Sequence, residues 1–125
     1  MKTGKEVLEQ ALRLLGYTNH TGDIDAVRDA ELFKSGSAKV RQIYYELQRI
    51  EHPDDIDTDF NMTKELKLSP ITIEDVMPYG VAMLIAQSDG NYNSQTLFAQ
   101  LYNQKRSSVP KPVARVKDVI PRGGC

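Results

Sequence analysis

The chain has 125 residues, of which 26% are charged and 40% are hydrophobic, as is typical of one soluble domain with a modest core. No apolar run approaches the roughly 20 residues that span a bilayer, and the start MKTGKEVLEQ lacks an apolar signal-peptide core, so we expect synthesis in the cytoplasm and no membrane partner. The single cysteine, Cys125, excludes an internal disulfide and a zinc site built from several cysteines.

The formal net charge of −1 conceals two segments of opposite charge. Residues 1–104 carry ten Lys/Arg against sixteen Asp/Glu, a net charge of −6, whereas residues 105–125 carry six Lys/Arg against one Asp, a net charge of +5. A basic tail on an acidic body suggests that the tail meets an acidic surface. That surface would belong to a partner protein, a nucleic acid or another copy of the body; simple solvation of the tail is the alternative.

The first predicted element is a helix over residues 3–15. Thr3 and Glu6 have the spacing of a capping box, in which each side chain accepts a hydrogen bond from the other residue's amide. Apolar residues then recur at intervals of three and four and predict one buried stripe: Val7, Leu8, Ala11, Leu12 and Leu15. Gly16 follows as a natural helix terminator.

A second helical pattern extends from Asp25 to about Ile50. Its early part is weak, and Gly36 between two serines is a position where the helix can bend or break. Its later part has a regular apolar stripe: Val40, Ile43, Tyr44, Leu47 and Ile50. We therefore predict one long helix or two collinear pieces.

The dipeptide His52-Pro53 ends this helix, because a residue before proline disfavours helical backbone. An acidic loop follows over residues 53–62. It does not fit a calcium-binding loop, since Phe60 stands where such a loop requires glycine, so a solvated acidic loop is the preferred reading. Residues 64–71 predict a short extended segment.

The third predicted helix begins at Ser69 or Thr72 and runs to about Ser88 through the apolar stretch VMPYGVAMLIA. Pro78 and Gly80 each disfavour a helix interior, by roughly 3 and 1 kcal/mol relative to alanine. We expect a short turn over residues 73–77, a bend at Pro78 and then a second helical start. Gly80, with two nearby alanines, would allow another helix to approach closely, so the candidate helix-packing residues are Pro78, Gly80, Ala82 and Ala86.

The fourth predicted helix is capped by Asn93 or Ser94 and presents four residues to the core: Leu97, Phe98, Leu101 and Tyr102. After Arg106 the composition changes to a basic segment with three prolines. We therefore predict an all-α fold, a small antiparallel bundle of about four helices over residues 1–106. Residues 107–125 form an extended C-terminal arm whose candidate partner-docking residues are Lys111, Arg115, Lys117 and Arg122.

No set of residues predicts catalysis. The two histidines, His20 and His52, fall in predicted loops, and no glycine-rich phosphate loop is present, so we expect neither an enzyme nor a cofactor or metal site. The segment that holds Lys39, Arg41 and Arg49 is the candidate for a helix that reads DNA. Nearby carboxylates, Glu46 and Glu51, balance these cations in the sequence, which disfavours that function.

Three stretches taken in order resemble the small helical head–tail connector proteins (adaptor or head-completion proteins) of tailed bacteriophages. The first is 6-EVLEQALRLLGY-17, which looks like that family's first helix. The second, 75-DVMPYGVAMLIAQSDGN-91, is similar to its hydrophobic helix with a Pro-x-Gly-Val-Ala sequence. The third, 98-FAQLYNQKR-106, is similar to its closing Phe-x-x-x-Tyr-Asn-x-Lys-Arg pattern. Residues 19–38 and the tail depart from the family pattern.

The resemblance implies a non-enzymatic virion protein at the head–tail junction. Such a protein forms a ring, usually of twelve copies, that docks beneath the portal protein, extends the DNA channel and receives the tail or a stopper protein. DNA would pass through the channel without sequence-specific binding, and an acidic body suits such a channel. The alternative functions are a small helical bacterial or prophage protein-interaction module and, less favoured, a DNA-binding regulator.

Overall fold

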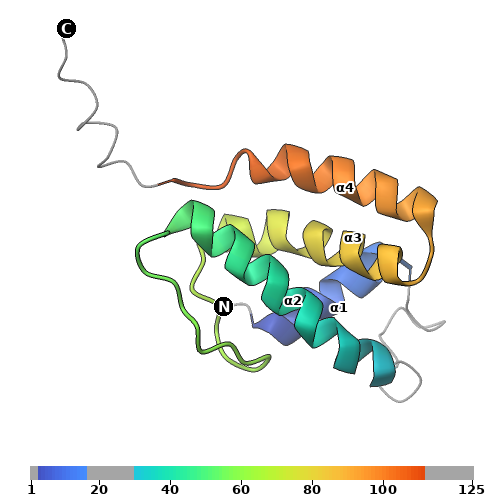
Figure 1. The fold of residues 1–125 in the computed structure, drawn as a ribbon, viewed down its shortest axis with the longest axis horizontal. Coiled ribbons are helices and arrows are strands. Elements are labelled where there is room, and N and C mark those ends of the chain that lie inside the picture. Colours follow the sequence, from blue (N-terminus) through green and yellow to red (C-terminus); the bar gives the residue numbers. More distant parts are fainter. Residues whose placement is uncertain (1–2, 17–29, 112–125) are drawn as a thin grey trace, which may run out of the picture.

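The computed structural model describes residues 3–16 and 30–111, and the expectations for residues 17–29 and 112–125 lie outside them. Four α-helices follow one another: α1 (Gly4–Leu14), α2 (Ala30–Glu51), α3 (Met77–Ser88) and α4 (Tyr92–Arg106) (Figure 1). A π-helical turn, η1 (Thr72–Val76), leads directly into α3. The described residues contain no β-strand, only an isolated antiparallel bridge between Thr3 and Glu65. The predicted all-α bundle is confirmed.

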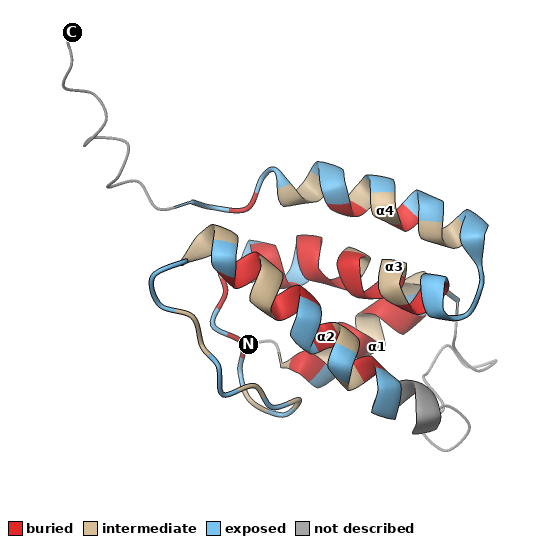
Figure 2. Ribbon diagram, in the orientation of Figure 1, coloured by how far each residue is buried: buried red, intermediate tan, exposed pale blue. Residues whose placement is uncertain are grey.

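Helix α3 lies at the centre of the bundle and contacts each of the other three helices. Figure 1 shows α4 antiparallel to α3, while α1 and α2 cross below them. Because α3 is apolar on nearly every side, it must be covered on every side, and Figure 2 shows it buried along most of its length. None of the helices that the structure describes is both long and apolar enough to cross a membrane.

The sequence signals at both ends of α1 are confirmed. The Thr3 hydroxyl accepts a hydrogen bond from the Glu6 amide, and the Glu6 carboxylate accepts one from the Thr3 amide in return. Gly16 adopts φ +81°, a backbone conformation that side chains other than glycine rarely tolerate. The buried stripe packs Val7, Leu8, Ala11 and Leu12 into the core.

Helix α2 continues through Gly36 without a break, so of the two predicted alternatives the described residues form one long helix. Gly36 is buried, and a Cβ atom added to it would lie 2.7 Å from a methyl carbon of Leu8. The glycine therefore serves close contact between α1 and α2 rather than interruption of α2. From Ala30 onward the segment is one helix.

The third helical segment begins earlier than η1, because Pro70 and Ile71 are already helical. Proline suits the first turn of a helix, where its missing N–H would have no partner in any case. In η1 the amide of Met77 donates to the carbonyl of Thr72, five residues back instead of four. Pro78 follows at once. A widened turn therefore accommodates the proline ring, and the helix continues without a break.

Two expectations for the fourth helix are wrong. The helix begins at Tyr92, because the side chain of Asn91, and not that of Asn93 or Ser94, accepts a hydrogen bond from the Ser94 amide. Leu97 is 52% exposed and does not belong to the core. Phe98 and Tyr102 do supply the buried face of α4.

Candidate functional site

The loop between α2 and η1 is attached to the flank of α2 by buried polar side chains. Gln48 is fully buried, and its amide group makes two hydrogen bonds with the backbone of Asp57. Its Oε1 accepts from the Asp57 amide at 2.6 Å, and its Nε2 donates to the Asp57 carbonyl at 3.2 Å. A buried amide side chain is stable only when its donors and acceptors are paired, so Gln48 fixes the loop's position.

The Asp57 carboxylate extends this attachment. It accepts hydrogen bonds from the Tyr44 hydroxyl at 2.9 Å and from the Asp59 amide at 3.0 Å, and Lys64 lies 3.4 Å away. Burial alone would raise the pKa of Asp57, but these hydrogen bonds and the Lys64 cation outweigh it and hold the pKa below its usual range. Burial and the neighbouring carboxylate together raise the pKa of Tyr44 above its usual range.

Glu51, the last residue of α2, binds the start of the third helical segment. Its carboxylate accepts hydrogen bonds from the Ser69 amide at 2.6 Å, the Ser69 hydroxyl at 3.0 Å and the hydroxyl of the buried Thr72 at 2.8 Å. A carboxylate at a helix N-terminus satisfies orphan amides and interacts favourably with the helix dipole. Glu51 thereby connects the end of α2 to the start of the third helical segment.

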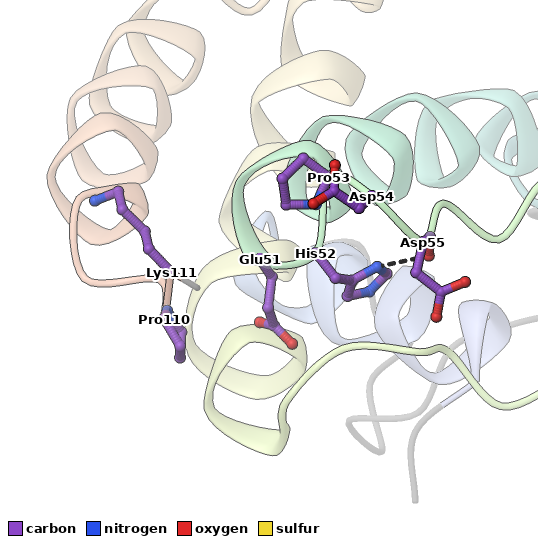
Figure 3. A pocket seen from close by; sticks show the side chains of 7 residues that line it. All are labelled: Glu51, His52, Pro53, Asp54, Asp55, Pro110 and Lys111. Atoms are coloured by element: carbon purple, nitrogen blue, oxygen red, sulfur yellow. Dashed lines mark hydrogen bonds between the residues drawn. The ribbon is translucent and has the colours of Figure 1, made fainter. Parts of the chain in front are cut away.

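A groove of about 300 Å³ lies beside this connection, where the described part of the arm ends (Figure 3). One wall follows the end of α2, and the other holds Pro110 and Lys111. Acidic residues dominate the first wall: Glu51, Asp54 and Asp55. His52 lies on the same wall, where its two ring nitrogens approach the carbonyl oxygens of Asp55 and Lys67. The groove therefore brings Pro110 and Lys111 beside three acidic residues, of which Glu51 is already bound to Ser69 and Thr72.

The predicted basic tail divides into two parts in the structure. Lys105 pairs with Asp75 at 3.1 Å, and Arg106 pairs with Glu46 at 2.9 Å, so these two cations stabilise the contacts of α4 with η1 and α2. The Tyr102 hydroxyl also donates a hydrogen bond to Glu46. Burial and this carboxylate raise the pKa of Tyr102 above its usual range. Residues 107–125 then retain four Lys/Arg against one Asp, a net charge of +3.

The four candidate helix-packing residues of α3 are all buried: Pro78, Gly80, Ala82 and Ala86. Around Gly80, however, the close neighbours are side chains instead of another helix backbone. A Cβ atom there would lie 2.8 Å from Cε1 of Tyr102 and 3.0 Å from Cδ1 of Ile43. Gly80 thus makes room for an aromatic ring from α4 and an aliphatic side chain from α2.

Of the candidate arm residues, Lys111 is exposed and lines the groove, whereas Arg115, Lys117 and Arg122 lie outside the described residues. The other predicted histidine, His20, also lies outside them. Within residues 3–16 and 30–111, no three His, Cys, Asp or Glu side chains come together as metal ligands would. The acidic loop uses Asp57 for its own attachment instead.

Comparison with known proteins gives no relative: no protein family, no curated protein and no solved structure matches the chain. The site rests on residues that sequence reasoning did not single out, chiefly Gln48 and the inward-facing carboxylate of Glu51. One signal was present. Gln48 follows Tyr44 by four residues, so both lie on the same face of α2 as the apolar stripe, where an amide requires a partner.

Proposed function

We propose that this protein is a structural head–tail connector of a tailed bacteriophage, acting in the virion at the portal vertex. The observation that carries the proposal is the ordered set of three stretches, 6–17, 75–91 and 98–106, that resemble the connector family. In the structure, α1 and α4, which hold most of the first and third stretches, both contact α3, which holds most of the second. A resemblance concentrated on one packed unit is what a shared fold would produce.

The proposed role is assembly without chemistry. Copies would form a ring, twelve in the family it resembles, beneath the portal protein, and the ring would receive the tail or a stopper protein. Lys111, the first of the proposed docking residues, is exposed and lines the groove beside the end of α2. An exposed, basic and proline-containing segment suits docking on an acidic partner surface.

Co-expression of this protein with the portal protein whose gene lies nearest in the same genome tests the proposed function. We expect the two proteins to copurify and electron microscopy to show a ring of this protein on one end of the portal. The triple substitution Lys111→Glu, Arg115→Glu and Lys117→Glu should abolish that complex while leaving the circular dichroism spectrum unchanged. Charge reversals of two exposed cations on α1, Lys5→Glu and Arg13→Glu, should leave it intact. A portal that never binds the wild-type protein would refute the connector role.

A further inference from the structure

The exposed face of α2 is basic, although the sequence of α2 looked balanced. Four cations lie between Lys34 and Ile50: Lys34, Lys39, Arg41 and Arg49. Lys34, Arg41 and Arg49 are exposed, and Lys39 is half-buried. The carboxylates that balance them in the sequence point elsewhere, since Glu46 binds Tyr102 and Arg106 of α4, and Glu51 binds Ser69 and Thr72. Glu46 and Glu51 therefore do not neutralise the cations on the outer surface of this part of α2.

Part of this basic face is held in a fixed arrangement. The guanidinium of Arg41 lies over the ring of Tyr45, 5.3 Å from its centroid, and the Tyr45 hydroxyl donates to the Thr58 carbonyl at 3.0 Å. Arginine and tyrosine side chains that are already ordered lose little entropy on binding, and both are enriched at the centres of protein interfaces. A groove of about 440 Å³, lined by Lys39 together with uncharged residues such as Gln42 and Leu84, adds surface for a protein partner.

The same chain carries a surface of opposite charge in the loop that follows α2. Residues 53–59 hold four aspartates and no lysine or arginine. Asp55 is exposed. Asp59 pairs with Lys64 at 3.5 Å but keeps 92% of its side chain exposed. Because Gln48 and Tyr44 attach this loop to α2, its carboxylates are presented on a fixed backbone. The loop turns back at the end of α2 and runs beside the flank of that helix, where Thr58 accepts the hydrogen bond from Tyr45 (Figure 1).

We propose that the basic face of α2 binds the acidic loop 53–59 of a second copy of this chain. A contact in which each copy gives its loop to one neighbour and its basic face to another is heterologous, and repetition of such a contact builds closed rings or filaments. The inference deepens the proposed connector function, on which its biological meaning rests, by naming the surfaces through which neighbouring copies meet. The same acidic loop makes a DNA duplex the less suitable occupant, because the loop borders the face and repels phosphate.

The test uses two opposite charge reversals in the full chain. Arg41→Glu/Arg49→Glu changes the basic face, and Asp55→Lys/Asp59→Lys changes the loop while sparing Asp57. Each double variant should weaken self-association, measured by analytical ultracentrifugation, by about tenfold or more, since like charges would then meet. The quadruple variant restores opposite charges across the contact and should associate as the wild type does. Lys5→Glu/Arg13→Glu on α1 is the control of equal charge change and should have no effect.

Several results would overturn the inference. One is a wild-type chain that stays monomeric at about 1 mM, even after chemical cross-linking. Others are double variants that associate as tightly as the wild type, or a quadruple variant that regains nothing. Retention of a labelled DNA duplex by the wild type, lost in Arg41→Glu/Arg49→Glu without any self-association, would assign the face to nucleic acid. Rings that form on the portal regardless of these charges would refute this contact while leaving the connector function standing.

Discussion

The ring of Tyr102 occupies the space that a side chain at Gly80 would need: an added Cβ atom would lie 2.8 Å from Cε1 of Tyr102. The ring is fully packed and its hydroxyl is bound to Glu46, so it has no free direction in which to move. Gly80→Ala should therefore lower the free energy of unfolding by about 1–3 kcal/mol despite the better helix propensity of alanine. Urea unfolding at neutral pH measures this loss.

Gly36→Ala is the matched control for that substitution. The atoms nearest to an added Cβ there are the terminal methyl groups of Leu8. These can move by a change of side-chain rotamer, whereas the rigid ring of Tyr102 at Gly80 cannot adjust its shape. We expect Gly36→Ala to cost less than Gly80→Ala, because the gain in helix propensity offsets part of the strain. Equal stability of wild type and Gly80→Ala would show that the contact with Tyr102 is not restrictive.

Pro78→Ala should change the free energy of unfolding by less than about 1 kcal/mol. A proline in an ordinary helix interior costs about 3 kcal/mol relative to alanine, so its removal would normally be stabilising. Here the turn η1 has already widened to admit the ring, and Met77 bonds to Thr72 instead of Ile73. A gain near 3 kcal/mol in urea unfolding would mean that η1 does not relieve the strain.

Asp57→Asn should destabilise the protein at pH 7 by about 1–3 kcal/mol, because it removes the charge to which Tyr44 and Lys64 are paired. The folded state lowers the pKa of Asp57 from its ordinary value of 3.8, so the stability that this carboxylate contributes is present above that value and lost as the pH falls through the lower, folded-state pKa. The difference between wild type and variant should accordingly shrink in urea titrations below pH 3.8. Asp59→Asn, at a largely exposed carboxylate, should show little effect at any pH.

Glu51→Ala should destabilise the protein by about 2 kcal/mol, since the Ser69 amide and the Thr72 hydroxyl would lose their acceptor while Thr72 stays buried. Hydrogen exchange should locate the damage at the start of the third helical segment, with faster exchange over residues 69–76. Glu65→Ala removes an exposed carboxylate and provides the comparison. Unchanged protection of residues 69–76 would contradict the capping role of Glu51.

Local rules predicted the parts of this fold that depend on neighbouring residues. The capping box of Thr3 and Glu6, the end of α1 at Gly16 and the stripes of α1 and α2 each follow from local spacings. The structure has all of them, although Leu15 and Ile50, the last members of the two stripes, are only partly buried. Four helices in an all-α bundle follow from the same periodicity. These features are set by the helix itself, so distant contacts do not alter them.

Features that depend on distant contacts could not be read in this way. The charge of the α2 surface depends on which way Glu46 and Glu51 point, and their partners are separated from them by 18 to 60 residues. The exposure of Leu97 likewise depends on which face of α4 meets α3. Gly36 illustrates the same difficulty. A glycine between two serines suggests a break in the helix, whereas in the structure its lack of a side chain leaves room for Leu8.

Val109 is 3% exposed and packs against the helical core, although it lies beyond the last residue of α4. The ladder of hydrogen bonds that ends α4 continues to it, because its amide donates to the Arg106 carbonyl at 3.2 Å. A protein shortened to Arg106 would thus expose part of the core, whereas one shortened after Lys111 would keep it sealed. The folded unit therefore extends to Val109, three residues past the end of α4.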